Sequence, residues 1–211
     1  MTRVKICGIR TADDAALAAR LGADFIGLVF APSPRQITLE EADAVRSGAA
    51  DGTARVGVFV DPEQPVIDAA VEAGGLSYLQ LHGSESQAFC ARQRLPVIKV
   101  VRVGSDDADA MFRAYEVDAF LLDTYDPERA GGSGRTFAWK DARRWVQGRR
   151  VFLAGGLTAG NVEGAIRTVG PYAVDVSSGV ESTPGHKDPL KIAGFLDAVR
   201  AADRGLAGER G

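Results

Sequence analysis

The feature that most constrains the fold is an alternation, repeated eight times along the 211 residues, of a short apolar run and a longer amphipathic stretch. Short apolar runs rich in β-branched residues predict strands, and amphipathic stretches of this length predict helices. The strands are expected at residues 3–7, 24–30, 55–60, 77–81, 97–101, 119–122, 150–153 and 173–176. The helices are expected at residues 11–21, 39–46, 62–73, 85–93, 106–115, 138–146, 159–169 and 189–202.

Eight strand–helix units in succession predict a parallel sheet, because each helix carries the chain back to begin a neighbouring strand. The strands are apolar nearly throughout, as strands covered on both faces are. Eight such units favour an α/β fold, a single (β/α)8 TIM barrel, and 211 residues lies at the compact end of that fold. An open doubly wound sheet is the alternative, but no G-x-G-x-x-G fingerprint follows the first strand. We expect one catalytic domain over residues 1–202 and a frayed tail over 203–211.

Local capping signals support the first two helices. Thr11 is expected to cap the first helix, and Gly22 stands just past its end. Thr38 is expected to cap the second helix, and Glu41 completes a capping box.

Composition excludes several classes of function. Hydrophobic residues make up 45% of the chain and charged residues 25%, as in ordinary soluble proteins. The net charge of −3 argues against a nucleic-acid partner. No apolar run approaches the ~20 residues that a membrane span needs, and the N-terminus lacks a signal-peptide core, so we expect a cytoplasmic protein with no membrane partner. Two cysteines are too few for a disulfide framework, and two histidines rule out a multi-histidine metal site.

The predicted strand ends carry the polar groups. In a (β/α)8 barrel the active site lies at the carboxyl ends of the strands. The groups expected there are Cys7-Gly8, the loop Pro32-Ser33-Pro34-Arg35, Asp61, His82-Gly83, Arg102, Asp123, Gly155-Gly156-Leu157 and Ser177-Ser178-Gly179. A purely structural barrel has no need of polar groups at nearly every strand end.

The glycines after the last two strands indicate a phosphate site. Gly155-Gly156 and Ser177-Ser178-Gly179 would let backbone N–H groups approach a ligand closely, at the usual phosphate position of such barrels. Either motif alone is equally explained by a tight turn. The two together, on adjacent strands, favour phosphate.

Cys7 is a candidate base. A free cysteine in an apolar strand is most often a small core residue, which is our interpretation of Cys90. Cys7 differs because Gly8 follows it and so places it at the mouth of the barrel. Lys5, two residues back, points to the same side of the strand, and a nearby ammonium favours the thiolate form of a cysteine. Position alone leaves the functional and the core roles equally open.

Asp123 and Arg35 are further candidates, each with a structural alternative. Asp123 ends the sixth apolar run and could act as an acid opposite Cys7, or could cap the loop that follows. That loop, residues 124–136, is long and glycine-rich, as a lid over a site is, or it is a disordered connection. Arg35 stands on a loop stiffened by two prolines and could bind a carboxylate with two parallel hydrogen bonds, or be one of many surface arginines.

The chain resembles the phosphoribosylanthranilate isomerases of tryptophan biosynthesis. The matching segments are KICGI (5–9), GLVF (27–30) with SPR (33–35), VGVFV (56–60), LQLHG (79–83), LLD (121–123), GGSG (131–134), LAGGL (153–157), DVSSGVE (175–181), and Gly185 with Lys187-Asp188. They occur in order across residues 4–188. Each segment is weak alone, but the ordered set, KICGI and DVSSGVE above all, is specific.

This resemblance implies the Amadori rearrangement of N-(5-phosphoribosyl)anthranilate to 1-(2-carboxyphenylamino)-1-deoxyribulose 5-phosphate. It implies that Asp123 protonates the ribose ring oxygen and that Cys7, as thiolate, removes the C2 proton. Arg35 would hold the anthranilate carboxylate, and the phosphate would lie on backbone amides near Gly156, Ser178 and Gly179. Gly155 and Ser177 are also expected to bind the substrate. His82 is also expected to contact this phosphosugar substrate. No metal or organic cofactor is implied, and we expect a monomer or a homodimer.

Two positions depart from the family pattern, and other functions stay open. Arg10 follows KICGI where the family often has threonine, and Arg135 follows the glycine loop where lysine is common. A metal-dependent epimerase is disfavoured by the two histidines. A sibling phosphosugar isomerase with aspartates at strands one and five is disfavoured by Cys7 and by Val101 or Arg102, and a Schiff-base aldolase would need Lys5 or Lys99. A non-catalytic phosphometabolite-binding barrel is the alternative from another class.

Overall fold

The expected (β/α)8 barrel is confirmed. The computed structural model describes residues 1–49, 52–103, 105, 107–123 and 139–209. Eight parallel strands close into a barrel in chain order. They are β1 (Arg3–Cys7), β2 (Phe25–Val29), β3 (Ala54–Phe59), β4 (Tyr78–Leu81), β5 (Val97–Arg102), β6 (Ala119–Asp123), β7 (Val151–Leu153) and β8 (Ala173–Val176). Each lies within two residues of its predicted bounds, because buried parallel strands leave an unbroken apolar signature.

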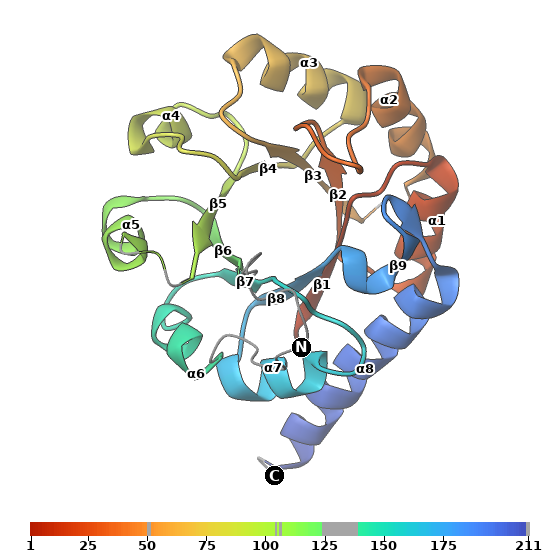
Figure 1. Cartoon of the computed structure of the whole chain (residues 1–211), viewed down its shortest axis with the longest axis vertical. Coiled ribbons are helices and arrows are strands. Elements are labelled where there is room, and N and C mark those ends of the chain that lie inside the picture. The colour runs from red at the N-terminus through yellow and green to blue at the C-terminus, as the bar shows by residue number, and fades with distance from the viewer. Residues whose placement is uncertain (50–51, 104, 106, 124–138, 210–211) are drawn as a thin grey trace.

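The helices ring the barrel, as Figure 1 shows. They are α1 (Ala12–Leu21), α2 (Leu39–Gly48), α3 (Gln64–Gly74), α4 (Gln87–Ala91), α5 (Ala108–Ala114), α6 (Trp139–Ala142), α7 (Val162–Val169) and α8 (Pro189–Gly208), with short 3-10 helices η2 (Arg143–Trp145) and η3 (Ser178–Val180). Among the described residues, no helix combines the length and the apolar character needed to cross a bilayer.

The predicted caps of the first two helices are confirmed. The Thr11 side chain accepts a hydrogen bond from the backbone of Asp14, and Gly22 ends α1 in the left-handed conformation. Thr38 and Glu41 form the reciprocal capping box of α2. Both helices therefore begin where short-range sequence signals place them.

Other helix bounds differ from those predicted. α4 begins at Gln87 rather than at residue 85, because Glu85 is not helical and instead forms a buried ion pair with Lys99. α7 begins at Val162 rather than near residue 159, since the Asn161 side chain closes a turn on the backbone of Thr158. Residues 203–208, expected to fray, continue α8, and Asp203 accepts hydrogen bonds from the backbone and hydroxyl of Thr2. The proposed lid, residues 124–136, and Arg135 lie outside the described residues.

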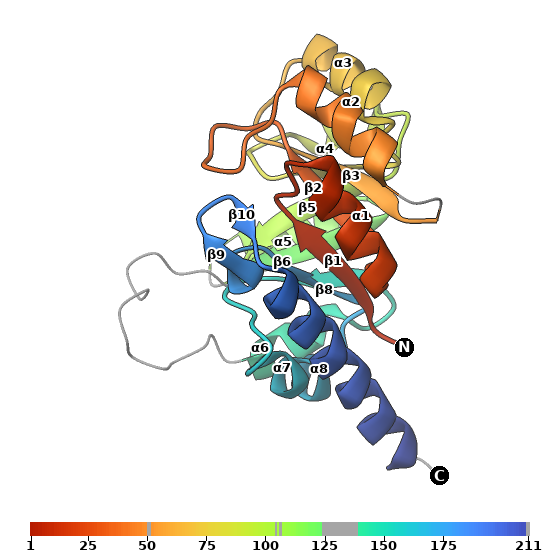
Figure 2. The same cartoon turned by 90° about the vertical axis from the view of Figure 1, so that its right-hand side faces the viewer.

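A short antiparallel hairpin follows η3 and was not predicted. It comprises β9 (Glu181–Thr183) and β10 (His186–Lys187). Figure 2 shows it at the same end of the barrel as the loop that leaves β2. This is the end at which the strands terminate, so the hairpin borders the expected site.

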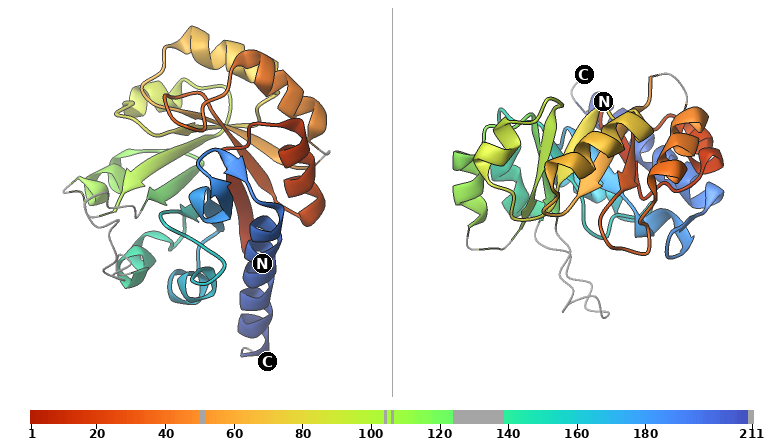
Figure 3. Two further views of the ribbon diagram at one scale, coloured as in Figure 1. Left: turned by 45° about the vertical axis from the view of Figure 1, so that its right-hand side comes forward. Right: turned by 90° about the horizontal axis from the view of Figure 1, so that it is seen from above.

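The core has two layers. Apolar side chains inside the barrel form one cluster, which includes Phe25, Val56, Ile98, Leu121 and Phe152. A larger apolar cluster lies between the strands and the surrounding helices. The two views of Figure 3 show these helices outside the barrel. This packing leaves the carboxyl ends of the strands to carry polar side chains.

Candidate active site

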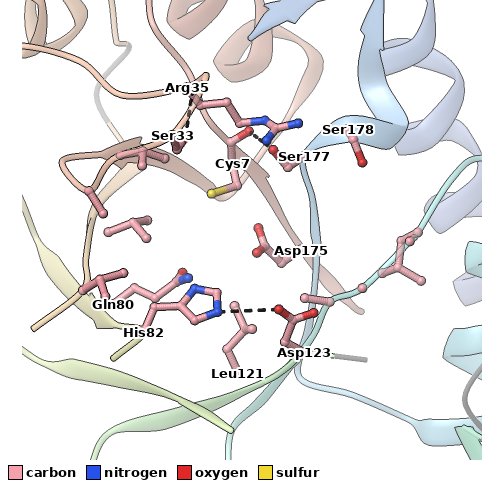
Figure 4. Close-up of a pocket in the computed structure, with 18 of the residues that line it drawn as sticks. Cys7, Ser33, Arg35, Gln80, His82, Leu121, Asp123, Asp175, Ser177 and Ser178 are labelled. Atoms are coloured by element: carbon pink, nitrogen blue, oxygen red, sulfur yellow. Dashed lines mark hydrogen bonds and ion pairs between the residues drawn. The ribbon is translucent and has the colours of Figure 1, made fainter. Parts of the chain in front are cut away.

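A cavity of about 530 Å³ opens at the carboxyl ends of the strands. Its size suits a drug-sized metabolite. The lining residues are Cys7, Val29, Ala31, Pro32, Ser33, Arg35, Val58, Val60, Gln80, His82, Leu121, Asp123, Ala154, Gly155, Gly156, Leu157, Asp175, Ser177 and Ser178. The lining thus draws on most strands of the barrel, as Figure 4 shows.

Eight of the nine residues given a catalytic or substrate-binding role from the sequence line this cavity: Cys7, Arg35, His82, Asp123, Gly155, Gly156, Ser177 and Ser178. Gly179 does not. Its α-carbon instead faces the backbone carbonyl of Leu157, so closely that a β-carbon at Gly179 would collide with it. Gly179 therefore serves the close approach of the loops after β7 and β8.

Cys7 lies beside a buried cation. The ammonium of Lys5 is fully buried and lies 3.0 Å from the Asp175 carboxylate. Both Lys5 and Cys7 border the space above Gly27, where a β-carbon would lie 2.8 Å from Cys7 Sγ and 3.0 Å from Lys5 Nζ. Burial alone would lower the pKa of Lys5, but the charges of Asp175 and Cys7 outweigh it and raise that pKa. Lys5 is therefore a fixed positive charge next to the sulfur.

Asp123 faces His82. Asp123 is the last residue of β6, and His82 directly follows β4. The Nε2 atom of His82 lies 3.5 Å from Oδ2 of Asp123, and both side chains are partly exposed to the cavity. In Figure 4 they border the side of the pocket away from Cys7. A carboxyl group and a thiol thus face one cavity from different strands.

Arg35 makes a two-pronged contact with Glu181. Its Nε and Nη2 each donate to one carboxylate oxygen of Glu181, both at 2.7 Å. Lys187 Nζ, fully buried, also donates to Glu181 at 2.9 Å. Burial would raise the pKa of Glu181, but hydrogen bonds from Arg35 and Lys187 and their charges lower it to about 2. Arg35 is consequently no ordinary surface arginine.

The loops after β7 and β8 bring backbone turns to the cavity. Gly155 and Gly156 both have positive φ, 88° and 64°, so their turn needs glycine. The Asn161 side chain holds this turn by donating to the carbonyl of Gly156. Across from it, Ser177 Oγ donates to the carbonyl of Cys7 and thereby ties β8 to β1. Turned backbone of this kind presents N–H groups to an anion.

Sequence reasoning gave no role to several residues now found at the site. Gln80 and Asp175 line the cavity, and strand alternation could have placed both there, two residues before His82 and Ser177. The Oε1 atom of Gln80 is buried without a hydrogen-bond partner among the described residues. Glu181 and Lys187 lie in segments that match the isomerase family, but no local sequence pattern indicates that they contact Arg35. Within the described ranges, no cluster of three or more metal-binding side chains occurs.

Comparison with known proteins identifies one family. Residues 4–198 match the family model of N-(5'-phosphoribosyl)anthranilate (PRA) isomerase. The N-(5'-phosphoribosyl)anthranilate isomerase of Pelobacter propionicus is 46% identical over 197 residues, which cover 93% of this chain and 94% of the relative.

Solved structures agree. The phosphoribosyl anthranilate isomerase of Thermotoga maritima has a TM-score of 0.86 at 40% identity and covers 95% of this chain and 100% of its own. That protein is described as dimeric and has also been solved as monomers. A further isomerase structure is a complex with reduced 1-(o-carboxyphenylamino)-1-deoxyribulose 5-phosphate, with a TM-score of 0.83 at 38% identity over 95% of this chain and 100% of that one.

Proposed function

The chain belongs to the N-(5'-phosphoribosyl)anthranilate isomerase family, and we propose that its cavity carries out that isomerisation with Cys7 as general base and Asp123 as general acid. The reaction is the Amadori rearrangement of tryptophan biosynthesis that the sequence motifs imply. The observation that carries the assignment is that Cys7 and Asp123, 116 positions apart, line one cavity at the mouth of the barrel.

The reaction needs one proton given and one taken. Asp123 donates a proton to the ribose ring oxygen, and the ring opens to an iminium at C1. Cys7, as thiolate, then removes the proton from C2 to give an enolamine, which becomes the ketone of the product as C1 gains a proton and the C2 hydroxyl loses one. The buried ammonium of Lys5 lies beside the Cys7 sulfur at this step.

His82 acts with the acid. Its imidazole lies against Asp123, so we assign it the orientation of that carboxyl group toward the ring oxygen, in addition to the substrate contact expected from the sequence. Arg35 holds the anthranilate carboxylate. The turns at Gly155-Gly156 and Ser177-Ser178 hold the phosphate, supported by the positive φ angles of the two glycines.

The proposed steps are proton transfers between side chains and substrate, and they use no metal or organic cofactor. Activity should therefore persist in EDTA. A monomer or homodimer is proposed, in line with the dimeric and monomeric forms of the Thermotoga maritima relative. A cytoplasmic location is proposed from the biosynthetic role and from two cysteines that are both free and buried.

Two experiments test the function. The purified protein should convert freshly made N-(5-phosphoribosyl)anthranilate to product, measured by chromatographic separation of substrate and product. Expression should also restore growth without tryptophan to an auxotroph that lacks this isomerase. Soluble protein that binds the reduced product analogue but neither turns over substrate nor restores growth would instead establish the non-catalytic binding barrel.

A further inference from the structure

The Arg35 guanidinium has one edge bound to Glu181, and its other edge has no partner among the residues that the structure describes. Its Nε and Nη2 donate to Glu181, which uses two of the five N–H groups of an arginine. The other three belong to Nη1 and the outer side of Nη2, and together they form the end-on fork that pairs with a second carboxylate. Arg35 lines the cavity, and its side chain is 24% exposed. One carboxylate thus anchors the guanidinium while the other edge can serve a ligand.

Glu181 is itself held in place. Its side chain is 4% exposed, and Oε1 accepts from both Lys187 Nζ and Arg35 Nε. Lys187 is fully buried and donates also to the carbonyl of Ser177. Burial, together with the charge of Arg35, lowers the pKa of Lys187, whereas the hydrogen bond and the charge of Glu181 raise it, so Glu181 helps to keep this buried ammonium protonated. If Glu181 moved away, Lys187 would be left as a buried charge without its counter-ion.

The backbone fits around this group of charges. Gly8 has a φ of 79°, and a β-carbon there would lie 2.6 Å from Cδ of Arg35, so the arginine stem packs directly on the turn after β1. Gly185, in the β9–β10 hairpin with a φ of 82°, packs against the same loop, where a β-carbon would lie 2.6 Å from the carbonyl oxygen of Pro34. The hairpin and the loop that carries Arg35 therefore form one packed unit.

We propose that Glu181 and Lys187 are positioning residues that fix the Arg35 guanidinium so that its free edge recognises the carboxylate of the substrate. The inference rests on the proposed function and deepens it, because it assigns substrate specificity to the β9–β10 hairpin. Two cations and one anion leave a net charge of +1, so Lys187 offsets Glu181 and the charge of Arg35 remains for the ligand.

An alternative is that Glu181 occupies Arg35 only until the substrate carboxylate displaces it. The burial of Glu181 and its ion pair with Lys187 argue against displacement of Glu181 from Arg35, because Glu181 would lose its buried position and its bond to Lys187 if it moved away. The two possibilities predict opposite effects of removing the Glu181 charge. Positioning predicts weaker binding of a carboxylate ligand, whereas competition predicts tighter binding.

The test measures dissociation constants of two probes for wild type and Glu181→Gln. One probe is reduced 1-(o-carboxyphenylamino)-1-deoxyribulose 5-phosphate, and the other is the same compound with hydrogen in place of the carboxylate. We expect Glu181→Gln to weaken the first probe by about 10-fold and the second by less than about 3-fold, since only the first uses the charge-assisted fork. In turnover, KM should rise about 10-fold while kcat changes less than about 3-fold.

The matched control is Glu163→Gln, because Glu163 also pairs with an arginine, Arg167, but on the surface of α7. It should leave the dissociation constants of both probes unchanged.

If Glu181→Gln folds poorly, Glu181→Asp keeps the charge on a shorter side chain. The ratio of the affinities for the two probes is also independent of the folded fraction. Equal weakening of both probes, unchanged binding, or tighter binding of the carboxylated probe would each overturn the proposal. If wild type had no isomerase activity, the proposed function would be refuted. The ratio of the dissociation constants of the two probes would still test whether Glu181 positions Arg35.

Discussion

The Nε2 atom of His82 lies 3.5 Å from Oδ2 of Asp123, so the end of β4 meets the end of β6 at the cavity. Asp123→Asn should lower kcat by at least about 100-fold, because an amide cannot donate the ring-opening proton. Affinity for the reduced product analogue should stay within about 3-fold.

His82→Asn should lower kcat by only about 10-fold, since this substitution removes a neighbour of the acid Asp123 and leaves the acid itself in place. Single-turnover rates of Asp123→Asn and His82→Asn distinguish the two roles. An equal loss of rate in the two variants would show that His82 takes part directly in proton transfer.

The two buried cysteines allow a matched comparison. Cys7→Ala should lower kcat by at least about 100-fold, because no other thiolate can remove the C2 proton. Cys90→Ala should keep activity within about 2-fold, since Cys90 packs in the layer between strands and helices. Burial raises the pKa of the Cys90 thiol, so iodoacetamide at neutral pH should inactivate wild type by modifying Cys7. Modification of Cys90 first, traced by peptide mass, would count against this assignment.

The sequence predicts the barrel better than it predicts the site. Buried parallel strands are apolar along their whole length, so all eight could be found, and the fold rule then placed Cys7 and Asp123 at one mouth. Helix ends that are set by long-range contacts cannot be predicted from apolar runs. Glu85, for example, was expected to begin a helix, but it lies outside α4 and pairs with Lys99. The bond from Arg35 to Glu181 joins residues 146 positions apart. Periodicity carries no information about such a pair, and it emerges only when the hairpin folds onto the loop.

Glu181 should also link stability to pH. Its pKa is about 2 in the folded protein against an ordinary value of 4.5. A depressed carboxyl pKa stabilises the fold fully above the unfolded value, and this contribution is lost as pH falls toward the folded value. Urea unfolding between about pH 6 and pH 2.5 should therefore show wild type losing its advantage over Glu181→Gln below about pH 4.5. A constant difference across this range would mean that Glu181 is not ionised in the ion pair.

Glu85 and Lys99 should be strongly coupled in stability. Lys99 Nζ is fully buried, lies 2.6 Å from Oε2 of Glu85, and donates also to the carbonyl of Gly83. Glu85 accepts in turn from the backbone of Gly83 and Asp61, so the pair holds the ends of β3 and β4. Lys99→Met or Glu85→Gln alone should cost roughly 3–5 kcal/mol, because each leaves a buried charge unpaired.

The double variant distinguishes coupling from separate packing roles of Glu85 and Lys99. It should cost clearly less than the sum of the two single variants, because neither charge is then left behind. Urea unfolding at neutral pH gives all three values. Additive losses would show that the two side chains do not act as a pair.

Gln80 offers a test in which stability and activity should move in opposite directions. Its Oε1 is buried in the cavity lining with no hydrogen-bond partner among the described residues. An unsatisfied buried acceptor costs roughly 1–3 kcal/mol, so Gln80→Met, which is similar in shape, should leave stability unchanged or raise it by about 1 kcal/mol. Gln80 lines the cavity, so removal of its amide group should also lower kcat/KM, by about 10-fold. A loss of stability with unchanged kcat/KM would show that Gln80 serves the fold, whereas the expected result would show that the chain keeps an unsatisfied group there for its ligand.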